Sequence, residues 1–277
     1  MNIFGKICFL VMLLFINNII IFAQKKNIQS STMNHGESIS YDIHFKWGLF
    51  IQRAGDAVFS YDRDNSVANA TSRYRMTFKT TKFFDAFFKM RDTLSCYYNS
   101  DNVLIYSKKE TDEGNYYSIE ELTFNYGEKE TNIHSFRYTP TRVRIDTVLT
   151  TTDSDIADLL GTIFHIRGIN RNNLQNGDVF PVTVAIGRDL VKVRFNYQNQ
   201  SIVEQGNVKY NTRYFKIDIL DDAFESTKTS AEIWISDDDN FLPVKVRTKL
   251  KIGYAEIFYK SSSNLAHPLK SRIEVKK

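Results

Sequence analysis

The sequence YDIHFKW, at residues 41–47, alternates strictly between two kinds of side chain. Its odd-numbered residues are aromatic or aliphatic, and its even-numbered residues are charged or polar. This period-two alternation is typical of a β-strand with one buried and one solvated face. The pattern returns at residues 191–197 and 244–252, so it extends over both halves of the chain.

Short polar segments separate further strand-like runs. Turn-forming sequences stand at 62–65, 99–102, 112–115 and 237–240, and each is rich in Asp, Asn or Gly. Aromatic residues make up 14% of the chain, which holds only 4 prolines, and this composition favours long uninterrupted strands. The pattern predicts a meander of antiparallel hairpins.

Two segments have helical rather than alternating spacing. In 154–167 the apolar residues recur at intervals of three and four, which predicts a helix that ends near Gly168. In 81–88, four phenylalanines would form one apolar face of a short helix.

These elements predict an all-β fold: a strongly curved, mostly antiparallel sheet, or an open or closed β-barrel, with one or two short helices on its concave side. We expect residues 39–277 to form a single large β domain. Two halves, 39–150 and 170–277, could be joined by the helix at 154–167.

The N-terminus has the pattern of an export signal. Residues 1–23 combine the basic Lys6, an apolar core and a small residue, Ala23, before polar sequence begins. We expect a signal peptide here, followed by a flexible polar arm at 24–38. A retained membrane anchor is the alternative. Cys8 lies inside the apolar core rather than after it, so we expect a periplasmic protein of the bacterial envelope that is not a lipoprotein.

The sequence contains few signs of common enzyme chemistry. No histidines have metal-ligand spacing, and no G-x-S-x-G or phosphate-binding glycine motif is present. Cys96 lies in a strand-like run, which indicates a buried small side chain. Loss of Lys6 with the signal would change the formal charge from +4 to +3, which is mild for a nucleic-acid binder. We therefore expect no catalytic residues, no metal and no cofactor.

Two groups of residues are candidates for binding. The first is expected near an apolar cavity or in a lid over it, and consists of Phe83, Phe84, Phe87, Phe88, Trp47 and Trp234. A helix that fills the core, or an edge that touches a membrane, would also explain the phenylalanines. The second is a basic row on one strand: Lys245, Arg247, Lys249 and Lys251. It is either a solvated face or a surface for an anionic partner.

The chain resembles the bacterial envelope family of unknown function DUF3108. Four stretches in the same order carry the likeness: YDIHFKWG at 41–48, DLLGTIFHIR at 158–167, GDVF at 177–180 and IWISDDDNFLPV at 233–244. The resemblance implies no reaction and no catalytic residues. The last hairpin is also similar to that of the LolA/LolB-type lipoprotein carriers, which are open barrels around helices.

Three functions follow as hypotheses. The leading one is a non-enzymatic binder or carrier of an apolar or lipid-like ligand, with peripheral membrane contact possible. The second is a structural or assembly partner of other envelope proteins, which would present the basic row or a sheet edge. The third is an enzyme whose site is dispersed along the sequence.

Overall fold

The computed structural model of the protein describes residues 32–220, 228–250 and 253–274. The predicted signal at 1–23, residues 24–31 of the predicted arm, and Lys251 lie outside these residues. The described structure consists of one large sheet and two short helices, α2 (Lys82–Asp85) and α3 (Gly161–Arg167). No described helix has the length and apolar character needed to cross a bilayer.

The first eight strands follow one another as an antiparallel meander. They are β1 (Glu37–Trp47), β2 (Phe50–Arg63), β3 (Ser72–Thr80), β4 (Arg91–Tyr98), β5 (Leu104–Glu113), β6 (Tyr116–Tyr126), β7 (Thr131–Thr139) and β8 (Arg142–Thr151). Each pairs with the next along the sequence, as the alternating pattern and its turns predicted.

The second half continues the same sheet. Its strands are β9 (Ile156–Ala157), β10 (Val179–Ile186), β11 (Asp189–Gln205), β12 (Val208–Leu220), β13 (Lys228–Ser236), β14 (Pro243–Lys249), β15 (Tyr254–Ser263) and β16 (Arg272–Glu274). The two halves join where β1 pairs with β15, and among the described strands only β9 with β10 is a parallel pair. The expected curved, mostly antiparallel sheet is therefore confirmed.

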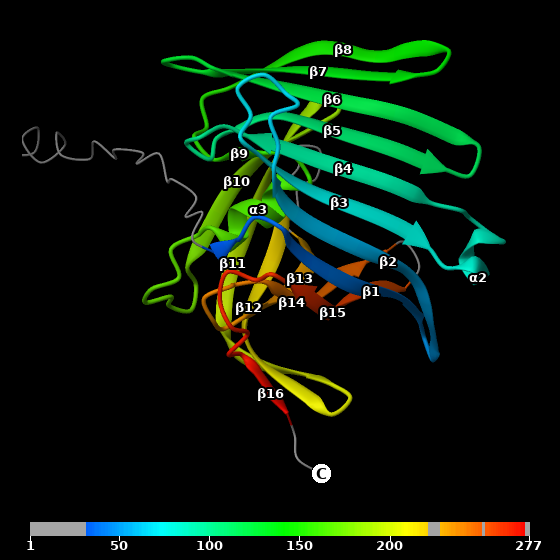
Figure 1. Cartoon of the computed structure of the whole chain (residues 1–277), viewed down its shortest axis with the longest axis vertical. Helices are drawn as coiled ribbons and strands as arrows, with labels where there is room; N and C mark the ends of the chain where they lie inside the picture. The colour runs from blue at the N-terminus through cyan, green and yellow to red at the C-terminus, as the bar shows by residue number, and fades with distance from the viewer. Residues whose placement is uncertain (1–31, 221–227, 251–252, 275–277) are drawn as a thin grey trace, which may run out of the picture.

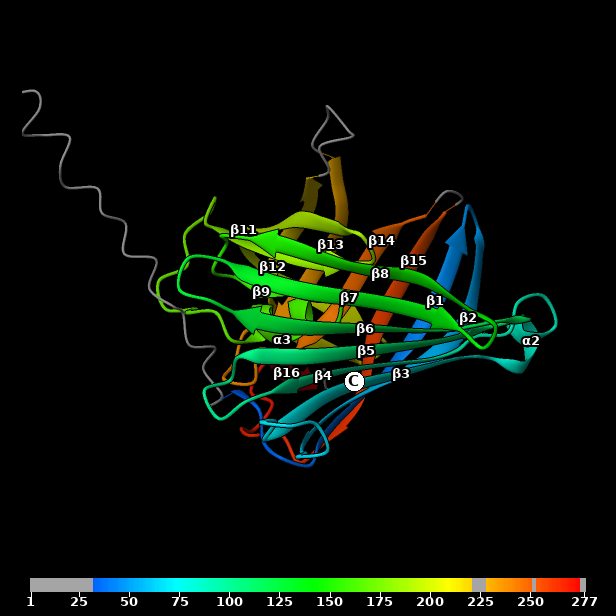
Figure 2. The same cartoon turned by 90° about the horizontal axis from the view of Figure 1, so that it is seen from above.

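The sheet curls around α3, so that strands of the two halves face each other across the helix (Figures 1 and 2). Its end strands, β8 and β9, do not pair, so hydrogen bonds do not close it into a barrel. Side chains span part of the gap instead. Ser135 Oγ of β7 donates to the carbonyl of Gly187 at 2.5 Å, and Arg188 Nη2 donates to the carbonyl of Arg144 at 3.0 Å.

Apolar side chains fill the space inside the curve. One cluster lies under β3–β7 and includes Phe164 of α3, and a second lies under β10–β13 and includes Ile166 of the same helix. A third lies at the β1–β15 junction. Because α3 contributes to two of the clusters, it serves as the cover that a large curved sheet requires.

The predicted helix at 154–167 is shorter than its apolar spacing suggested. Ile156 and Ala157 form the parallel pair with β10, and the helix begins only at Gly161. The Asp158 carboxylate accepts a hydrogen bond from the Gly161 backbone N at 2.7 Å. A side chain that binds the backbone in this way favours a turn over another helical turn, so the prediction was wrong for residues 154–160.

The turns between antiparallel strands fall alternately at two ends of the sheet. We call one end the α2 rim; it carries the connections at 48–49, 81–90, 114–115, 140–141 and 250–253. The other end is the cleft rim, with the connections at 64–71, 99–103, 127–130, 152–155 and 237–242. In Figure 1 the turns that join β1–β2, β5–β6 and β7–β8 all lie at the right, on the same side of the molecule as α2.

Candidate functional site

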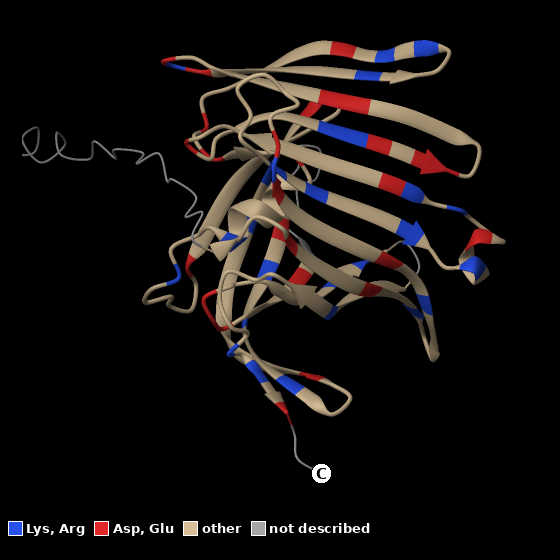
Figure 3. Cartoon of the chain, viewed as in Figure 1, with Lys and Arg blue, Asp and Glu red and all other residues tan. Residues whose placement is uncertain are grey.

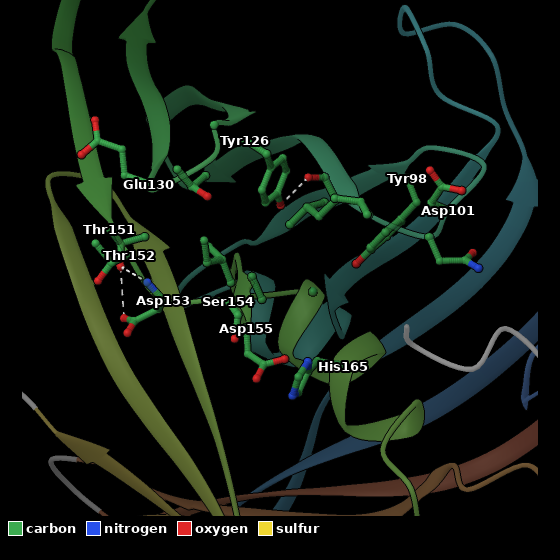
Figure 4. Close-up of a pocket in the computed structure, with 18 of the residues that line it drawn as sticks. Tyr98, Asp101, Tyr126, Glu130, Thr151, Thr152, Asp153, Ser154, Asp155 and His165 are labelled. Carbon is green, nitrogen blue, oxygen red and sulfur yellow. Dashed lines mark hydrogen bonds between the residues drawn. The ribbon is translucent and has the colours of Figure 1, made fainter. Parts of the chain in front are cut away.

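A cleft of about 360 Å³ opens at the cleft rim, between the sheet and α3. Three connections converge there, at 99–103, 127–130 and 152–155, and Gly161 and His165 of α3 form the adjoining wall (Figure 4). Meander topology brings these turns to the same end of the sheet, and the curl of the sheet turns them toward the helix. Connections that are far apart in sequence therefore share one concave surface.

Local hydrogen bonds fix the turns around the cleft. The Asn99 side-chain oxygen accepts from the backbone N of Asp101 and of Val103, each at 3.0 Å. Asp153 Oδ2 accepts from Thr151 Oγ1 at 3.1 Å and from Thr183 Oγ1 at 2.5 Å. These two hydroxyls, with Thr183 the stronger influence, lower the pKa of Asp153 and keep it charged.

Carboxylates dominate the charge of the cleft lining. They are Asp101, Glu128, Glu130, Asp153 and Asp155, whereas Lys129 and His165 are the basic residues that line it. Hydroxyl side chains at 131, 151, 152 and 154 add further hydrogen-bonding groups. Charges of one sign in a recess raise the local concentration of oppositely charged solutes, so this surface favours a cationic ligand.

Two tyrosines form the aromatic part of the lining. The Tyr98 ring stacks on Phe164 of α3 with 4.2 Å between ring centroids, and Tyr126 donates its hydroxyl proton to the Leu104 carbonyl at 2.8 Å. Burial raises the pKa of both phenols, so both remain neutral. Tyr98 is buried and supports the wall, whereas the exposed ring of Tyr126 can bind the apolar portion of a cationic ligand and can also contact its charge.

A buried polar cluster lies behind the Tyr98 wall. Cys96 Sγ donates to Asp158 Oδ1 at 2.9 Å, and Cys96 is fully buried, as its strand-like context predicted. Burial, followed by the nearby Asp158 carboxyl, raises the pKa of the Cys96 thiol well above its ordinary value. A nucleophilic cysteine requires the opposite shift, so this cluster gives no support to covalent catalysis.

The structure does not gather the predicted apolar site residues around a cavity. Phe83, Phe87 and Phe88 are exposed, Phe84 is half-buried, and all four lie on the α2 rim, away from the cleft. The interpretation of these residues as a helix filling the core is therefore wrong. Trp47 is also exposed on the α2 rim. Ligand binding by these residues stays a prediction.

Trp234 lies elsewhere, within β13. Its ring stacks on Tyr214 with 4.9 Å between centroids, and Lys245 Nζ lies 5.0 Å above it. The indole therefore packs on the sheet surface, among neighbours from β12 and β14. It neither lines the cleft nor joins the phenylalanines.

The basic row is largely neutralised by its neighbours. Lys245 Nζ lies 3.5 Å from Glu256 Oε1, and Arg247 lies 3.0 Å from the same atom and 3.8 Å from Glu232. Burial alone would raise the pKa of Glu256, but Lys245 and Arg247 lower it overall. Carboxylates of the adjacent strands thus accompany these two cations, which favours a solvated sheet face. Lys249 ends β14 and is exposed.

The cleft itself was not predicted from the sequence. Its acidic residues stand in turns, where Asp and Asn have an ordinary structural role. One available signal was the run of three threonines, Asp153, Ser154 and Asp155 at 150–155, which is denser in polar ligating groups than a turn needs. His165 is half-buried at the cleft wall.

Solved structures that are similar to this chain include those of two proteins. A beta-barrel-like protein of the domain of unknown function DUF1849, from Brucella abortus, matches with a TM-score of 0.55 and 9% sequence identity over 83% of this chain and 98% of its own. A protein described as exported, with a YmcC-like fold, from Bacteroides fragilis, gives a TM-score of 0.31 and 8% identity over 84% of this chain and 97% of its own. At 9% identity, the likeness to the Brucella abortus protein concerns the fold alone.

Sequence comparison gives a family but no activity. No curated protein matches the chain. Residues 40–259 match the family described as "Protein of unknown function (DUF3108)", from β1 to β15. This region includes the whole cleft and α3, and it confirms the resemblance stated from the four sequence stretches. The chain belongs to the DUF3108 family.

Proposed function

We propose that this protein is a non-enzymatic binding protein and that its cleft takes a small cationic ligand, such as a polyamine or another organic amine. One observation carries the proposal: five carboxylate side chains and the exposed ring of Tyr126 line a single 360 Å³ cleft. The volume suits a small molecule rather than a protein segment. We also propose that the protein acts in the periplasm, on the basis of the signal-like residues 1–23.

An apolar or lipid-like ligand, the leading hypothesis from the sequence, is less well supported as cargo. Three apolar clusters fill the interior of the described sheet. Most side chains that line the cleft are polar, and none of the predicted phenylalanines or tryptophans is among them. Most of the large apolar side chains that are exposed among the described residues lie on or near the α2 rim, where they would meet a surface rather than enclose a molecule.

Calorimetric titration with spermidine at low ionic strength tests the proposal. We expect saturable binding that weakens as salt is added, because screening reduces attraction between exposed charges. The double variant Glu128→Gln, Glu130→Gln should weaken binding by about tenfold, which corresponds to about 1.4 kcal/mol. If the double variant binds spermidine as tightly as the unaltered protein does, then spermidine binds at another site and the proposal fails.

A matched control separates the cleft from total charge. Glu204→Gln with Glu274→Gln removes the same two negative charges from exposed positions outside the cleft. We expect this variant to bind spermidine as the unaltered protein does. An equal loss in both double variants would mean that spermidine responds to net charge, and the proposal would fail.

A role in assembly is the second candidate, and the open edge of the sheet favours it. β8 pairs only with β7, so its outer edge is free of a strand partner among the described residues. Such an edge can accept a strand from another chain. A photo-crosslinker at the exposed Val148 should capture a specific envelope protein in cells. Capture of the same protein from Val179, outside β8, would argue against edge pairing.

A further inference from the structure

Exposed apolar side chains concentrate on the α2 rim. Of the twenty large apolar side chains that are exposed among the described residues, twelve lie on this rim or within a few residues of its turns. They are Trp47, Leu49, Phe50, Ile51, Phe83, Phe87, Phe88, Tyr116, Tyr117, Val143, Leu250 and Tyr254. The other eight are distributed over the rest of the described surface.

The phenylalanine segment is held in place by polar contacts on its other side. Asp85 accepts hydrogen bonds from Arg91 at 2.6 and 3.0 Å and from Thr80 Oγ1 at 2.5 Å. The Thr81 backbone N donates to the Ala54 carbonyl of β2 at 2.9 Å. These bonds attach the segment to β2 and β4, and three of its four phenylalanine side chains are exposed. Phe87 is 75% exposed.

The neighbouring β1–β2 and β14–β15 hairpins also carry exposed apolar side chains at their turns, which we call hairpin tips. In the β1–β2 turn, Trp47 is 62% exposed and Leu49 is fully exposed. The β14–β15 turn lies against this hairpin, since a side chain at Gly253 would collide with the backbone of Lys46 and Trp47. Gly253 has φ +72, a conformation that glycine adopts without strain. Close contact of the two turns makes their apolar residues continuous.

Basic residues flank most of these tips. Lys46 precedes Trp47, Lys82 and Lys89 bracket the phenylalanines, and Lys249 precedes Leu250. Arg142 and Arg144 stand on either side of Val143, and the β5–β6 turn, with Glu113, is the acidic exception. The cleft rim has the opposite character, with acidic residues in most of its turns (Figure 3). Exposed apolar side chains with basic neighbours thus mark the α2 rim, although it also carries Asp85, Asp112 and Glu113, and acidic turns mark the cleft rim.

We propose that the α2 rim docks on an anionic lipid bilayer, inserting its hairpin tips into the headgroup region. Aromatic rings at the water–lipid boundary with adjacent lysines are the side chains that suit such an interface. Lysine stems lie along apolar surface while their ammonium groups contact anionic headgroups. A bilayer can also accommodate several separate hairpin tips, because fluid lipid fills the gaps between them. A folded protein surface would have to match those gaps in shape. Docking by this rim points the cleft away from the membrane.

Vesicle binding of the full chain tests the proposal. The protein should cosediment with vesicles that contain phosphatidylglycerol and much less with vesicles of phosphatidylcholine alone. Leu49→Ser with Phe87→Ser should weaken binding to the anionic vesicles by about tenfold or more, since each change removes an apolar side chain from the inserted tips. Both residues are exposed, so the fold should persist, which circular dichroism verifies.

The matched control carries Val148→Ser and Ile202→Ser, two residues that are each 58% exposed and lie away from this rim. Both variants keep the same N-terminal segment, so its own contribution to vesicle binding cancels in the comparison. Unchanged vesicle binding by the control, together with weaker binding by the rim variant, would show that the α2 rim makes the contact with the vesicles. Equal loss in both variants, no loss in the rim variant, or no cosedimentation of the unaltered protein with anionic vesicles overturns the proposal.

Fluorescence gives an independent readout. The chain has 2 tryptophans, Trp47 and Trp234, so Trp234→Phe leaves Trp47 as the reporter. Anionic vesicles should shift the Trp47 emission to shorter wavelength and allow quenching by brominated lipid. Emission that stays at the wavelength of a solvent-exposed indole, in protein shown to cosediment, would mean that another surface makes the contact.

Discussion

Arg167 Nη1 lies 2.5 Å from Glu37 Oε1, although 130 residues separate the two in the chain. Both side chains are fully buried, and Arg167 also donates to the carbonyls of Thr32 and Asn240. Burial alone would lower the pKa of Arg167, but the Glu37 carboxylate raises it overall. The pair therefore fixes the end of α3 to the start of β1 and to the β13–β14 turn.

Removal of one partner should destabilise the protein strongly. Arg167→Met leaves the Glu37 carboxylate buried without its counter-ion, which costs about 3–5 kcal/mol for such pairs. The double variant Arg167→Met, Glu37→Met removes both charges and should recover much of that loss. Urea unfolding followed by circular dichroism measures both values. A single variant that loses less than about 1 kcal/mol would show that water solvates Glu37 readily.

The aromatic contact of α3 with the sheet predicts a second large effect. The Phe164 ring stacks on Tyr98 and lies 5.7 Å from Tyr74 and 6.0 Å from Tyr61, measured between centroids. Phe164→Ala should reduce the free energy of unfolding by about 3–5 kcal/mol, because the rigid sheet cannot close the cavity. Phe164→Leu should cost clearly less. Similar small losses in both variants would indicate that α3 contributes little to the packing of the sheet.

Much of the sheet could be predicted from the sequence because a half-buried strand alternates locally. Positions such as 41–47 reveal their faces without reference to the rest of the chain. β10 was not predicted, since its buried run carries Pro181 and lacks a clear alternation. A glycine inside a strand weakens the strand pattern, yet β2 continues through Gly55, where a side chain would collide with the Lys79 carbonyl.

The candidate site was harder to predict from the sequence, because its residues come together only through the curvature of the sheet. Asp101, Glu130 and Asp155 each have an adequate local explanation as turn residues, and their convergence is a tertiary property. The phenylalanine segment shows the same limit. The position of its short helix was predicted. Whether other elements bury the apolar face of that helix depends on tertiary contacts, which the spacing of the four phenylalanines does not reveal.

Asp158 predicts a dependence of stability on pH. Burial raises the pKa of Asp158 above its ordinary 3.8, despite hydrogen bonds from Cys96 and Gly161 that lower it. The folded state therefore holds this proton more tightly than the unfolded state. The resulting stability is fully present below pH 3.8 and is lost as the pH rises through the folded pKa. Asp158→Asn, which does not titrate, should lack this loss.

Urea unfolding at a series of pH values from about 4 to 7 measures the effect, since the slope reports the difference in bound protons. The Asn variant should gain stability relative to the unaltered protein as the pH rises. Asp101→Asn, a change at an exposed turn, serves as the control and should leave the pH dependence unaltered. Parallel curves for the unaltered protein and Asp158→Asn would mean that Asp158 titrates alike in both states.

Charge reversal on the basic row should act on stability in a way that depends on position. Arg247→Glu would place a third carboxylate beside Glu232 and Glu256, and we expect a loss of about 1 kcal/mol or more in the free energy of unfolding. Lys249→Glu, at the exposed end of β14, should change it by less than about 0.5 kcal/mol. Thermal and urea unfolding at low and high salt measure both variants. The loss in Arg247→Glu should shrink as salt screens the carboxylates; a salt-independent loss would point to packing against Tyr254, over whose ring the guanidinium lies at 5.3 Å.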